Sequence, residues 1–387
     1  MVVASSEKRM RRSSAPLVGF IICFFGFVGL LFVPLWAPAL LRLEHWTADW
    51  RTAVLSDRGP AEHERLAVIL ISDDTLEPYP YLSPIDRGLL ANLVRAVDAA
   101  GARAVGIDIF FAKETEKSKD EQLLDAFQQA KSKIVIAALD KRGRLKPKQI
   151  RFQTEFLSRA ARSVGFINLS KDHDGVVRYH AQSHVDPEIP ISFSMQLARA
   201  DNAALIAEPS RISWLLPPRN GERTFFTLPA EALLPGTSAH ATSANNGDLR
   251  KLKDRIVLIG GDFAYRDRHE TPMTGGSVEK MLGVMVHAHL AAQLIDNRRA
   301  RELKPFDARI IFAALAFVGL LLGWRTQLRG YNVPGIAATA ILVGVDILVF
   351  WKTRVVLPFT LSVVAWYLGI TAGSFLQRIV VGKNPAQ

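Results

Sequence analysis

Long apolar runs alternate with ordinary globular sequence along this chain, and their positions define its organisation. The run 17–41 carries no charged residue. As a helix rising about 1.5 Å per residue it spans roughly 36 Å, which is enough to cross a bilayer. Three more apolar runs, at 309–325, 333–351 and 355–376, follow a long globular segment. The pattern predicts one membrane helix, a large domain over 42–308, and then three membrane helices.

Lysine and arginine residues next to the apolar runs predict which side of the membrane each segment faces. They are concentrated in the tail 1–16, in the turn after 309–325 and in the tail 377–387. Because basic segments stay in the cytoplasm, both termini are predicted inside a bacterial inner membrane and the domain 42–308 in the periplasm. A signal peptide cleaved near Ala37-Pro38-Ala39 is the alternative for the first run, which is longer than a usual signal-peptide core.

Within the large domain, apolar runs of strand length are separated by segments with helical periodicity. The runs lack polar alternation, which is typical of parallel strands that are covered on both faces. The fold class is therefore α/β, with a mostly parallel, mixed sheet of about seven to nine strands. The predicted strands are 66–72, 104–111, 133–139, 164–169, 175–179, 212–216, 224–228 and 255–260, and the predicted helices are 89–100, 121–130, 190–200 and 283–297.

A further helix is predicted directly after the first apolar run. Leu43, Trp46, Trp50 and Val54 recur there at helical spacing. This apolar stripe is expected to be the buried face of the helix and to pack on the outer domain.

Composition and motifs narrow the class of protein. The net charge of +11 lies partly in the predicted cytoplasmic tail, and no nucleic-acid-binding motif accompanies it, so the lipid bilayer is the expected partner and nucleic acid is not. The only cysteine, Cys23, lies inside the first apolar run, which leaves the outer domain without disulfides or thiolate metal sites. Phosphate-loop, GxSxG and HExxH motifs are absent from the sequence. No cofactor or metal is assigned, and the protein is predicted not to be an enzyme.

Acidic residues follow or end several predicted strands. Asp73 and Asp74 follow the first strand, Asp108 lies near the end of the second, and Asp262 follows the last. Parallel sheets bind ligands at the carboxyl ends of their strands, so these acids and the nearby Arg268 are candidate ligand-binding residues. A shared cluster could bind a divalent cation or an amine, or raise the pKa of one carboxyl group. Alternatively, the acids cap helices or satisfy loop N–H groups, and Arg268 forms an internal ion pair.

Small residues recur at four-residue spacing in two of the predicted membrane helices. Gly319 is followed by Gly323, and Gly369 by Gly373. Such pairs let two helix backbones approach closely. They predict packing within the membrane bundle, and the alternative is a self-association face that would produce a homo-oligomer.

Asp346 is an acidic residue within a predicted membrane span, about a turn and a half before its end. A carboxyl group at this depth is expected to find a basic partner. Lys352 or Arg354, at the outer end of the span, is the predicted partner, and a proton-relay role is the alternative.

Several short segments of the globular part form a recognisable set through their order and spacing. They are 43–51, 67–74, 100–110, 174–178, 256–260, 267–272 and 283–288. Together they resemble the type-two CHASE domain, an extracytoplasmic sensory module of bacterial receptors. One membrane helix before the domain and three after it is also the usual arrangement of that family.

The resemblance implies a membrane receptor that detects an extracytoplasmic ligand and takes part in signal transduction. In that family the last helix normally leads into a nucleotide cyclase or a kinase, whereas this chain ends at Gln387, so a stand-alone form with a separate output protein is expected. The loop 77–86 departs from the family's sequence and leaves the ligand unidentified. The alternatives are a periplasmic membrane-anchored enzyme that uses the carboxylate cluster, and a structural subunit of an envelope complex.

Overall fold

Contacts within the chain divide it into two units, which are described separately. The globular unit is 56–300, and the membrane-helix unit combines 1–55 with 301–387. Most of the predicted first span lies outside the described residues, so that span stays a prediction. The computed structural model describes residues 38–181, 186–204, 210–219, 221–234, 245–264, 266–275, 279–326 and 333–381.

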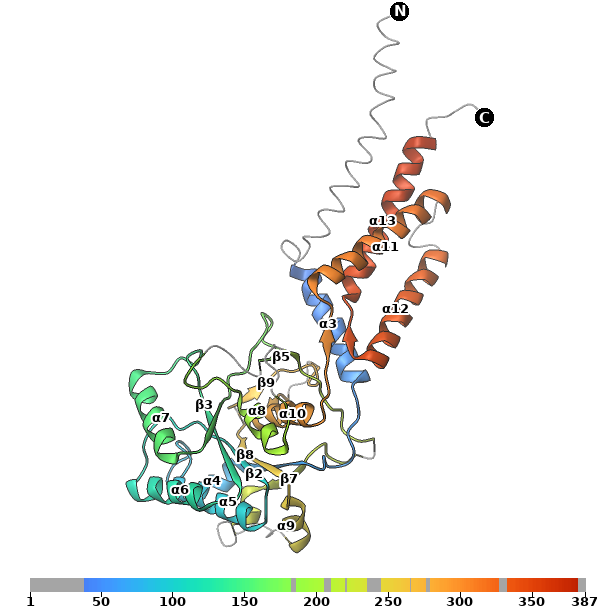
Figure 1. The fold of residues 1–387 in the computed structure, drawn as a ribbon. Helices are drawn as coiled ribbons and strands as arrows, with labels where there is room; N and C mark the ends of the chain where they lie inside the picture. The colour runs from blue at the N-terminus through green and yellow to red at the C-terminus, as the bar shows by residue number, and fades with distance from the viewer. Residues whose placement is uncertain are drawn as a thin grey trace, which may run out of the picture. The chain divides into compact units, whose positions relative to one another are not determined.

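The globular unit is built on a parallel sheet (Figure 1). Its strand order is β4-β3-β2-β8-β1-β7, and every neighbouring pair is parallel. The α/β fold with a mostly parallel sheet is therefore confirmed. The strands of this sheet are β1 (Leu66–Ser72), β2 (Ala104–Asp108), β3 (Lys133–Ala138), β4 (Ser163–Phe166), β7 (Phe226–Pro229) and β8 (Ile256–Asp262).

The sequence led to an overestimate of the size of the sheet, because a mixed sheet of about seven to nine strands was expected. In the described part of the chain the main sheet has six strands, and the segments 175–179 and 212–216 do not join it. Ile212 and Trp214 pack instead with residues of the helix α10 (Gly283–Ile295), which satisfies the burial that their apolar pattern indicates. The remaining strands of this unit are two-residue antiparallel pairs, β5 (Tyr179–His180) with β6 (Ser210–Arg211) and β9 (Arg268–His269) with β10 (Met281–Leu282).

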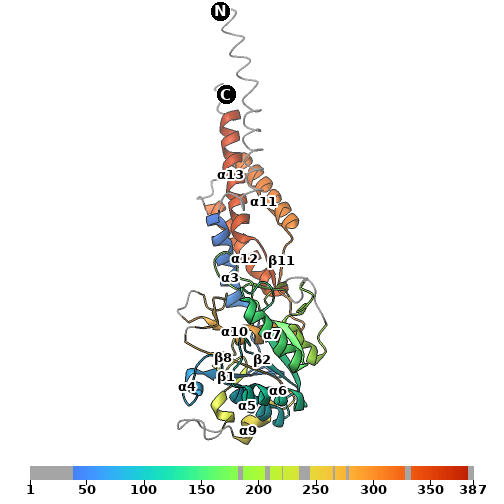
Figure 2. The same cartoon turned by 90° about the vertical axis from the view of Figure 1, so that its left-hand side faces the viewer.

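Helices cover both faces of the sheet (Figures 1 and 2). Side chains of β1 alternate between the two faces. Ala67, Ile69 and Ile71 pack in the cluster that contains residues of α5 and α6, whereas Leu66 and Val68 pack in the cluster with α8 and α10. Burial on both faces explains why these strands read as continuous apolar runs. The helices of this unit are α4 (Asp73–Leu76), α5 (Arg87–Ala99), α6 (Lys117–Gln129), α7 (Pro147–Ala160), α8 (Phe193–Ala198), η1 (Arg199–Asp201), η2 (Ala230–Leu233), α9 (Asn246–Leu252) and α10 (Gly283–Ile295).

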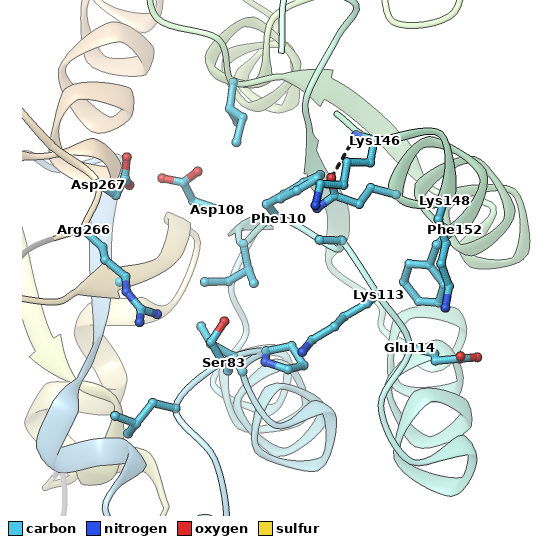
Figure 3. Close-up of a pocket in the computed structure, with 18 of the residues that line it drawn as sticks. Ser83, Asp108, Phe110, Lys113, Glu114, Lys146, Lys148, Phe152, Arg266 and Asp267 are labelled. Atoms are coloured by element: carbon cyan, nitrogen blue, oxygen red, sulfur yellow. Dashed lines mark hydrogen bonds between the residues drawn. The ribbon is translucent and has the colours of Figure 1, made fainter. Parts of the chain in front are cut away.

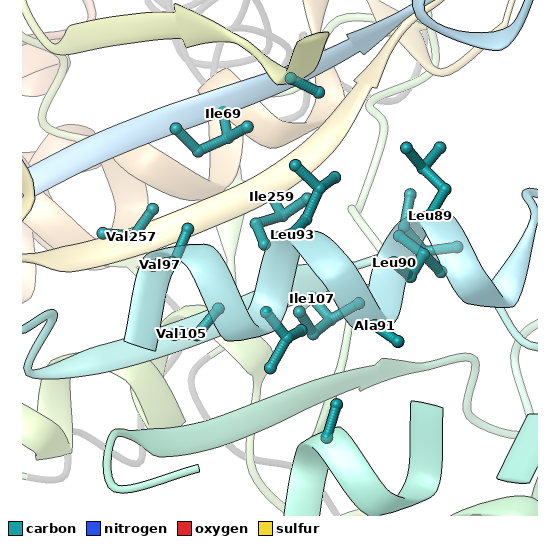
Figure 4. Close-up of a cluster of buried hydrophobic side chains, with 14 of the residues drawn as sticks. Ile69, Leu89, Leu90, Ala91, Leu93, Val97, Val105, Ile107, Val257 and Ile259 are labelled. Carbon is teal, nitrogen blue, oxygen red and sulfur yellow. The ribbon is translucent and has the colours of Figure 1, made fainter. Parts of the chain in front are cut away.

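The larger core lies between α5 and the sheet (Figure 4). Leu89, Leu93 and Val97 project from α5 at helical spacing towards Ile107 and Ile259 on the two central strands. All five side chains are at most 1% exposed. Removing one such side chain costs about 2–5 kcal/mol in comparable cores, so this layer fixes the position of the central strands.

The strand β8 comes late in the chain but lies between β1 and β2. The register places Ser72 opposite Asp262, and Asp108 opposite Gly260. The strands β2, β3 and β4 continue outward on one side of β8, while β1 and β7 lie on the other. Parallel sheets in which the strand order runs outward in both directions from the centre bind ligands at the carboxyl ends of the central strands.

The membrane-helix unit contains three helices that are long and apolar enough to cross a membrane, α11 (Pro305–Thr326), α12 (Val333–Thr353) and α13 (Phe359–Val381). They overlap the predicted spans, but α11 begins four residues before its span, and α13 begins four residues after the start of its span and ends five residues beyond it. At the start of the last span, β12 (Val355–Val356) pairs with β11 (Arg301–Glu302), so the helix begins only after Pro358.

The predicted glycine pairs lie where α11 and α13 touch. A Cβ atom added to Gly319 would come within 2.7 Å of the carbonyl oxygen of Trp366. Added methyl groups at Gly323, Gly369 and Gly373 would likewise collide with backbone carbonyls of the facing helix. The two backbones are therefore in direct contact along these small residues.

The helix α3 (Pro38–Leu55) buries the face opposite to the one predicted. The stripe of Leu43, Trp46, Trp50 and Val54 is exposed, and Trp46 is 64% exposed. The buried residues are instead Glu44, Ala48, Arg51 and Thr52. The stripe was wrongly predicted to be buried against protein, because an apolar helix face also suits lipid, and tryptophan favours the membrane interface.

The polar face of α3 is buried because its charged groups have partners within the same unit. Arg51 is 2% exposed and forms an ion pair with Asp346 on α12. It also donates to the carbonyl oxygen of Leu357 at 3.2 Å and lies 3.9 Å from the carboxylate of Glu44. The prediction that Asp346 pairs with Lys352 or Arg354 is therefore wrong. A partner far away in the sequence could not be found from local spacing.

Candidate functional site

A cavity of about 1150 Å³ opens at the carboxyl ends of β2 and β8 (Figure 3). Four segments of the globular unit and Ile167 line it, and the segments are residues 82–85, the end of β2 with the stretch that follows it, the first turns of α7, and the end of β8 with the loop after it. This is the edge at which parallel sheets bind small molecules, and the cavity is large enough to hold one.

Asp108, the last residue of β2, lies in the wall of this pocket with its carboxyl group buried. The residue is 8% exposed, and its Oδ2 atom has no hydrogen-bond partner among the described residues. Burial, and then the charge of Asp267, raise the pKa of Asp108 well above its ordinary value. Since buried polar groups are nearly always paired, this atom is free to contact a group that enters the pocket.

Asp267 lies beside Asp108 on the same side of the pocket, and the two carboxyl groups face each other (Figure 3). It lies in the loop after β8, where its φ of 51° is left-handed, and its backbone carbonyl accepts the N–H of Gly283 at 2.8 Å. Its carboxylate accepts a hydrogen bond from Nε2 of His269 at 3.0 Å. Burial opposes ionisation, but this bond and the charges of His269, His287 and Lys171 together outweigh it and lower the pKa of Asp267. The two facing carboxyl groups are thus shifted in opposite directions, one toward the neutral acid and one toward the anion.

Basic side chains line much of the rest of the pocket. They are Lys113, Lys146, Lys148, Arg151 and Arg266. None of them has a side-chain hydrogen bond or ion pair within the described ranges. Lys146 caps α7 through its backbone N–H, which donates to Oε1 of Gln149 at 2.9 Å. Three of the five belong to the N-terminal end of α7, where the helix dipole adds further positive potential. An anionic group entering the pocket would meet unpaired positive charge here.

The predicted site residues do not come together as one cluster. Asp73 and Asp74 are exposed in the first turn of α4, which is capped by the side chain of Ser72. Asp262 forms an ion pair with Arg268 at 2.7 Å. These placements correspond to the structural roles that were the alternative in the sequence, and of the predicted residues Asp108 alone lines the pocket.

The sequence pattern missed the basic wall because it did not predict α7. This helix is amphipathic but mostly polar, and its buried residues are Gln153, Phe156 and Ala160. Pro147 at its first position was the available signal, since proline favours that position of a helix. The neighbouring lysines, taken alone, resemble an ordinary solvated surface.

An α/β unit with a strand-end pocket, joined to membrane helices, has the architecture of a binding domain on a membrane protein. The chain matches the family model described as the CHASE2 domain over residues 25–324, and it therefore belongs to the CHASE2 domain family. This is a family of extracytoplasmic sensory domains and not of enzymes, so the chain is a membrane protein with a sensory domain outside the cytoplasm. No curated protein and no solved structure matches the chain.

Replacing Asp108 by asparagine is expected to hold or raise the stability of the unliganded protein. An unpaired buried carboxyl group costs about 1–3 kcal/mol, and asparagine removes its charge while keeping its shape. The raised pKa means that wild type loses stability as the pH rises from about 4 through that pKa. The gain from Asp108→Asn should therefore vanish near pH 4 and grow as the pH rises towards 8. Thermal unfolding across this pH range measures it.

Asp262→Asn is the matched control, because it removes a carboxylate that is paired with Arg268. It should lower the melting temperature slightly at pH 8, as expected for a partly exposed ion pair. A clear drop for Asp108→Asn at pH 8 would show that its carboxylate is a structural partner.

Proposed function

We propose that this protein is a receptor of the bacterial inner membrane whose periplasmic domain binds a small molecule in the pocket between Asp108 and α7. Binding changes the membrane helices, and a separate output protein reads the change from the cytoplasmic side, where both termini lie. The observation that carries this proposal is the buried carboxyl group of Asp108, whose Oδ2 atom has no partner among the residues that the structure describes, in the wall of a large cavity.

The loop that carries Asp267 supports a route from the pocket towards the membrane. The backbone carbonyl of Asp267 accepts the N–H of Gly283, the first residue of α10. A Cβ atom at Gly283 would collide with the Asp267 carboxylate, so the loop and the start of the helix are packed tightly together. The chain continues from α10 through β11 into α11. A ligand that moves Asp267 therefore acts on the element that precedes the membrane helices.

The proposal is tested on the full chain in lipid nanodiscs. A low-molecular-mass extract of bacterial envelopes should raise the melting temperature by several degrees, since a ligand at a hundredfold excess over its Kd adds about 2.7 kcal/mol. Ala112→Trp, which fills the pocket, should abolish the shift. Ala61→Trp places the same side chain at an exposed position outside the pocket and should leave the shift unchanged.

Transmission is tested with spin labels at Thr326 and Arg378, near the ends of α11 and α13, in a Cys23→Ser background. The extract should change the distance distribution between the labels, and Ala112→Trp should prevent the change. A melting shift with no change in this distance would contradict the receptor proposal. Chemical conversion of the bound compound would support the enzyme alternative instead.

A further inference from the structure

We propose that the pocket binds a zwitterion whose ammonium group and carboxylate are separated by several bonds, as in a short peptide. The ammonium group lies between Asp108 and Asp267, and the carboxylate lies against the basic residues at the start of α7. This inference rests on the proposed function and identifies the chemical class of its ligand.

The inner end of the pocket suits an ammonium group. Asp267 remains an anion, while Oδ2 of Asp108 lacks a hydrogen-bond partner in the described part of the chain. An ammonium group carries three N–H donors, which can be shared between two facing carboxyl groups. A divalent cation needs about six oxygen ligands, whereas much of the remaining lining is apolar, including Ile85, Ile109 and Phe263.

The opposite side of the pocket suits a carboxylate. Figure 3 shows Lys113, Lys146 and Lys148 across the pocket from the two aspartates. Together with Arg151 these side chains outnumber Glu114 and Glu155, the acids on the same side. The N-terminus of α7 adds to this positive potential, and unpaired basic groups readily form charge-assisted bonds with a carboxylate.

Arg266 is the basic residue on the acidic side of the pocket. It precedes Asp267 in the chain, but in Figure 3 its guanidinium group points away from both carboxyl groups. It therefore does not neutralise the Asp108–Asp267 pair directly. The acidic and basic groups remain on separate sides of the cavity, which favours a ligand with separated charges.

The size of the cavity favours a ligand longer than a free α-amino acid. A sphere of 1150 Å³ is about 13 Å across. The two charges of a free amino acid are attached to the same carbon atom, so they cannot reach both sides of such a cavity. An extended tripeptide spans about 10 Å between its charged ends and can do so.

Triglycine and two blocked analogues test this directly on the full chain in nanodiscs. Triglycine carries both charges, N-acetyltriglycine lacks the ammonium group, and triglycinamide lacks the carboxylate. We expect saturable binding of triglycine by calorimetry, and binding at least about tenfold weaker for each analogue, because each loses a charged contact. Asp108→Asn should weaken the binding of triglycine about tenfold and leave the binding of N-acetyltriglycine unchanged. Arg151→Gln should weaken the binding of triglycine and leave the binding of triglycinamide unchanged.

The outcomes separate this inference from the proposed function. If the envelope extract binds and triglycine does not, the inference is overturned and the receptor remains. If N-acetyltriglycine or triglycinamide binds as tightly as triglycine, the pocket recognises a single charge and the zwitterion is excluded. If Ca²⁺ alone raises the melting temperature and Asp108→Asn removes that effect, the inner end is a cation site instead.

Discussion

Gly323→Leu is expected to separate α11 from α13 and to destabilise the membrane-helix unit by at least about 3 kcal/mol. Overpacking a tight contact costs about 1–3 kcal/mol when side chains can move aside. Here the added atoms meet the backbone carbonyl of Ile370, which cannot rotate out of the way. The cost should therefore lie at or above the upper end of that range. Thermal unfolding of the full chain in nanodiscs measures it.

The chain offers a matched control within the same unit. Gly344 lies on α12, and an added Cβ atom there meets nothing within 4 Å. Gly344→Leu should be tolerated, with a change within about 0.5 kcal/mol. Equal losses for the two variants would show that α11 and α13 do not pack through their glycines.

Much of the fold is predictable because its strongest signals are local. Continuous apolar runs of strand length occur only where both faces of a sheet are covered, and the runs at β1, β3 and β8 lie in the sheet close to their predicted bounds. The glycine pairs are equally local signals. Close backbone approach requires small residues at fixed spacing, whichever helix is the partner.

The candidate site was less predictable because it depends on which residues meet across the sheet. Asp73, Asp108 and Asp262 all end or follow strands, yet only Asp108 faces the pocket. Two features decide which acid faces the pocket: the position of β8 between β1 and β2, and the turn after each strand. The length of an apolar run predicts neither the strand order nor the turn. Asp267 lines the pocket from a loop, where its own backbone has a left-handed φ. The sequence of the loop does not predict this conformation.

The predicted orientation of α3 was wrong for a different reason. Hydrophobic periodicity shows that a helix has an apolar face, but it does not say whether protein or lipid covers that face. In α3 the ion pair of Arg51 with Asp346 decides which face is buried. Burying an arginine requires a partner with excellent geometry, and that partner lies on a helix far away in the sequence.

Breaking this pair from one side should be among the most costly single substitutions in the chain. Arg51→Met leaves the carboxyl groups of Asp346 and Glu44 buried without their cation. It also removes the bond to the carbonyl oxygen of Leu357. We expect a loss of about 3–5 kcal/mol in the free energy of unfolding. Arg65→Met, which removes an exposed arginine paired with Asp201, is the control and should cost no more than about 1 kcal/mol.

The double variant separates the cost of an unpaired charge from the value of the pair. Replacing Arg51 by Met and Asp346 by Leu together removes both charges, so the loss should be smaller than for Arg51→Met alone, as for other buried pairs exchanged for apolar residues. Losses that simply add would show that the two side chains are not coupled. The pair also joins α3, which leads into the sensory domain, to α12. We therefore expect the apolar double variant to fold but to lose the ligand-dependent distance change between α11 and α13, because the charge contact that couples α3 to the other helices is gone.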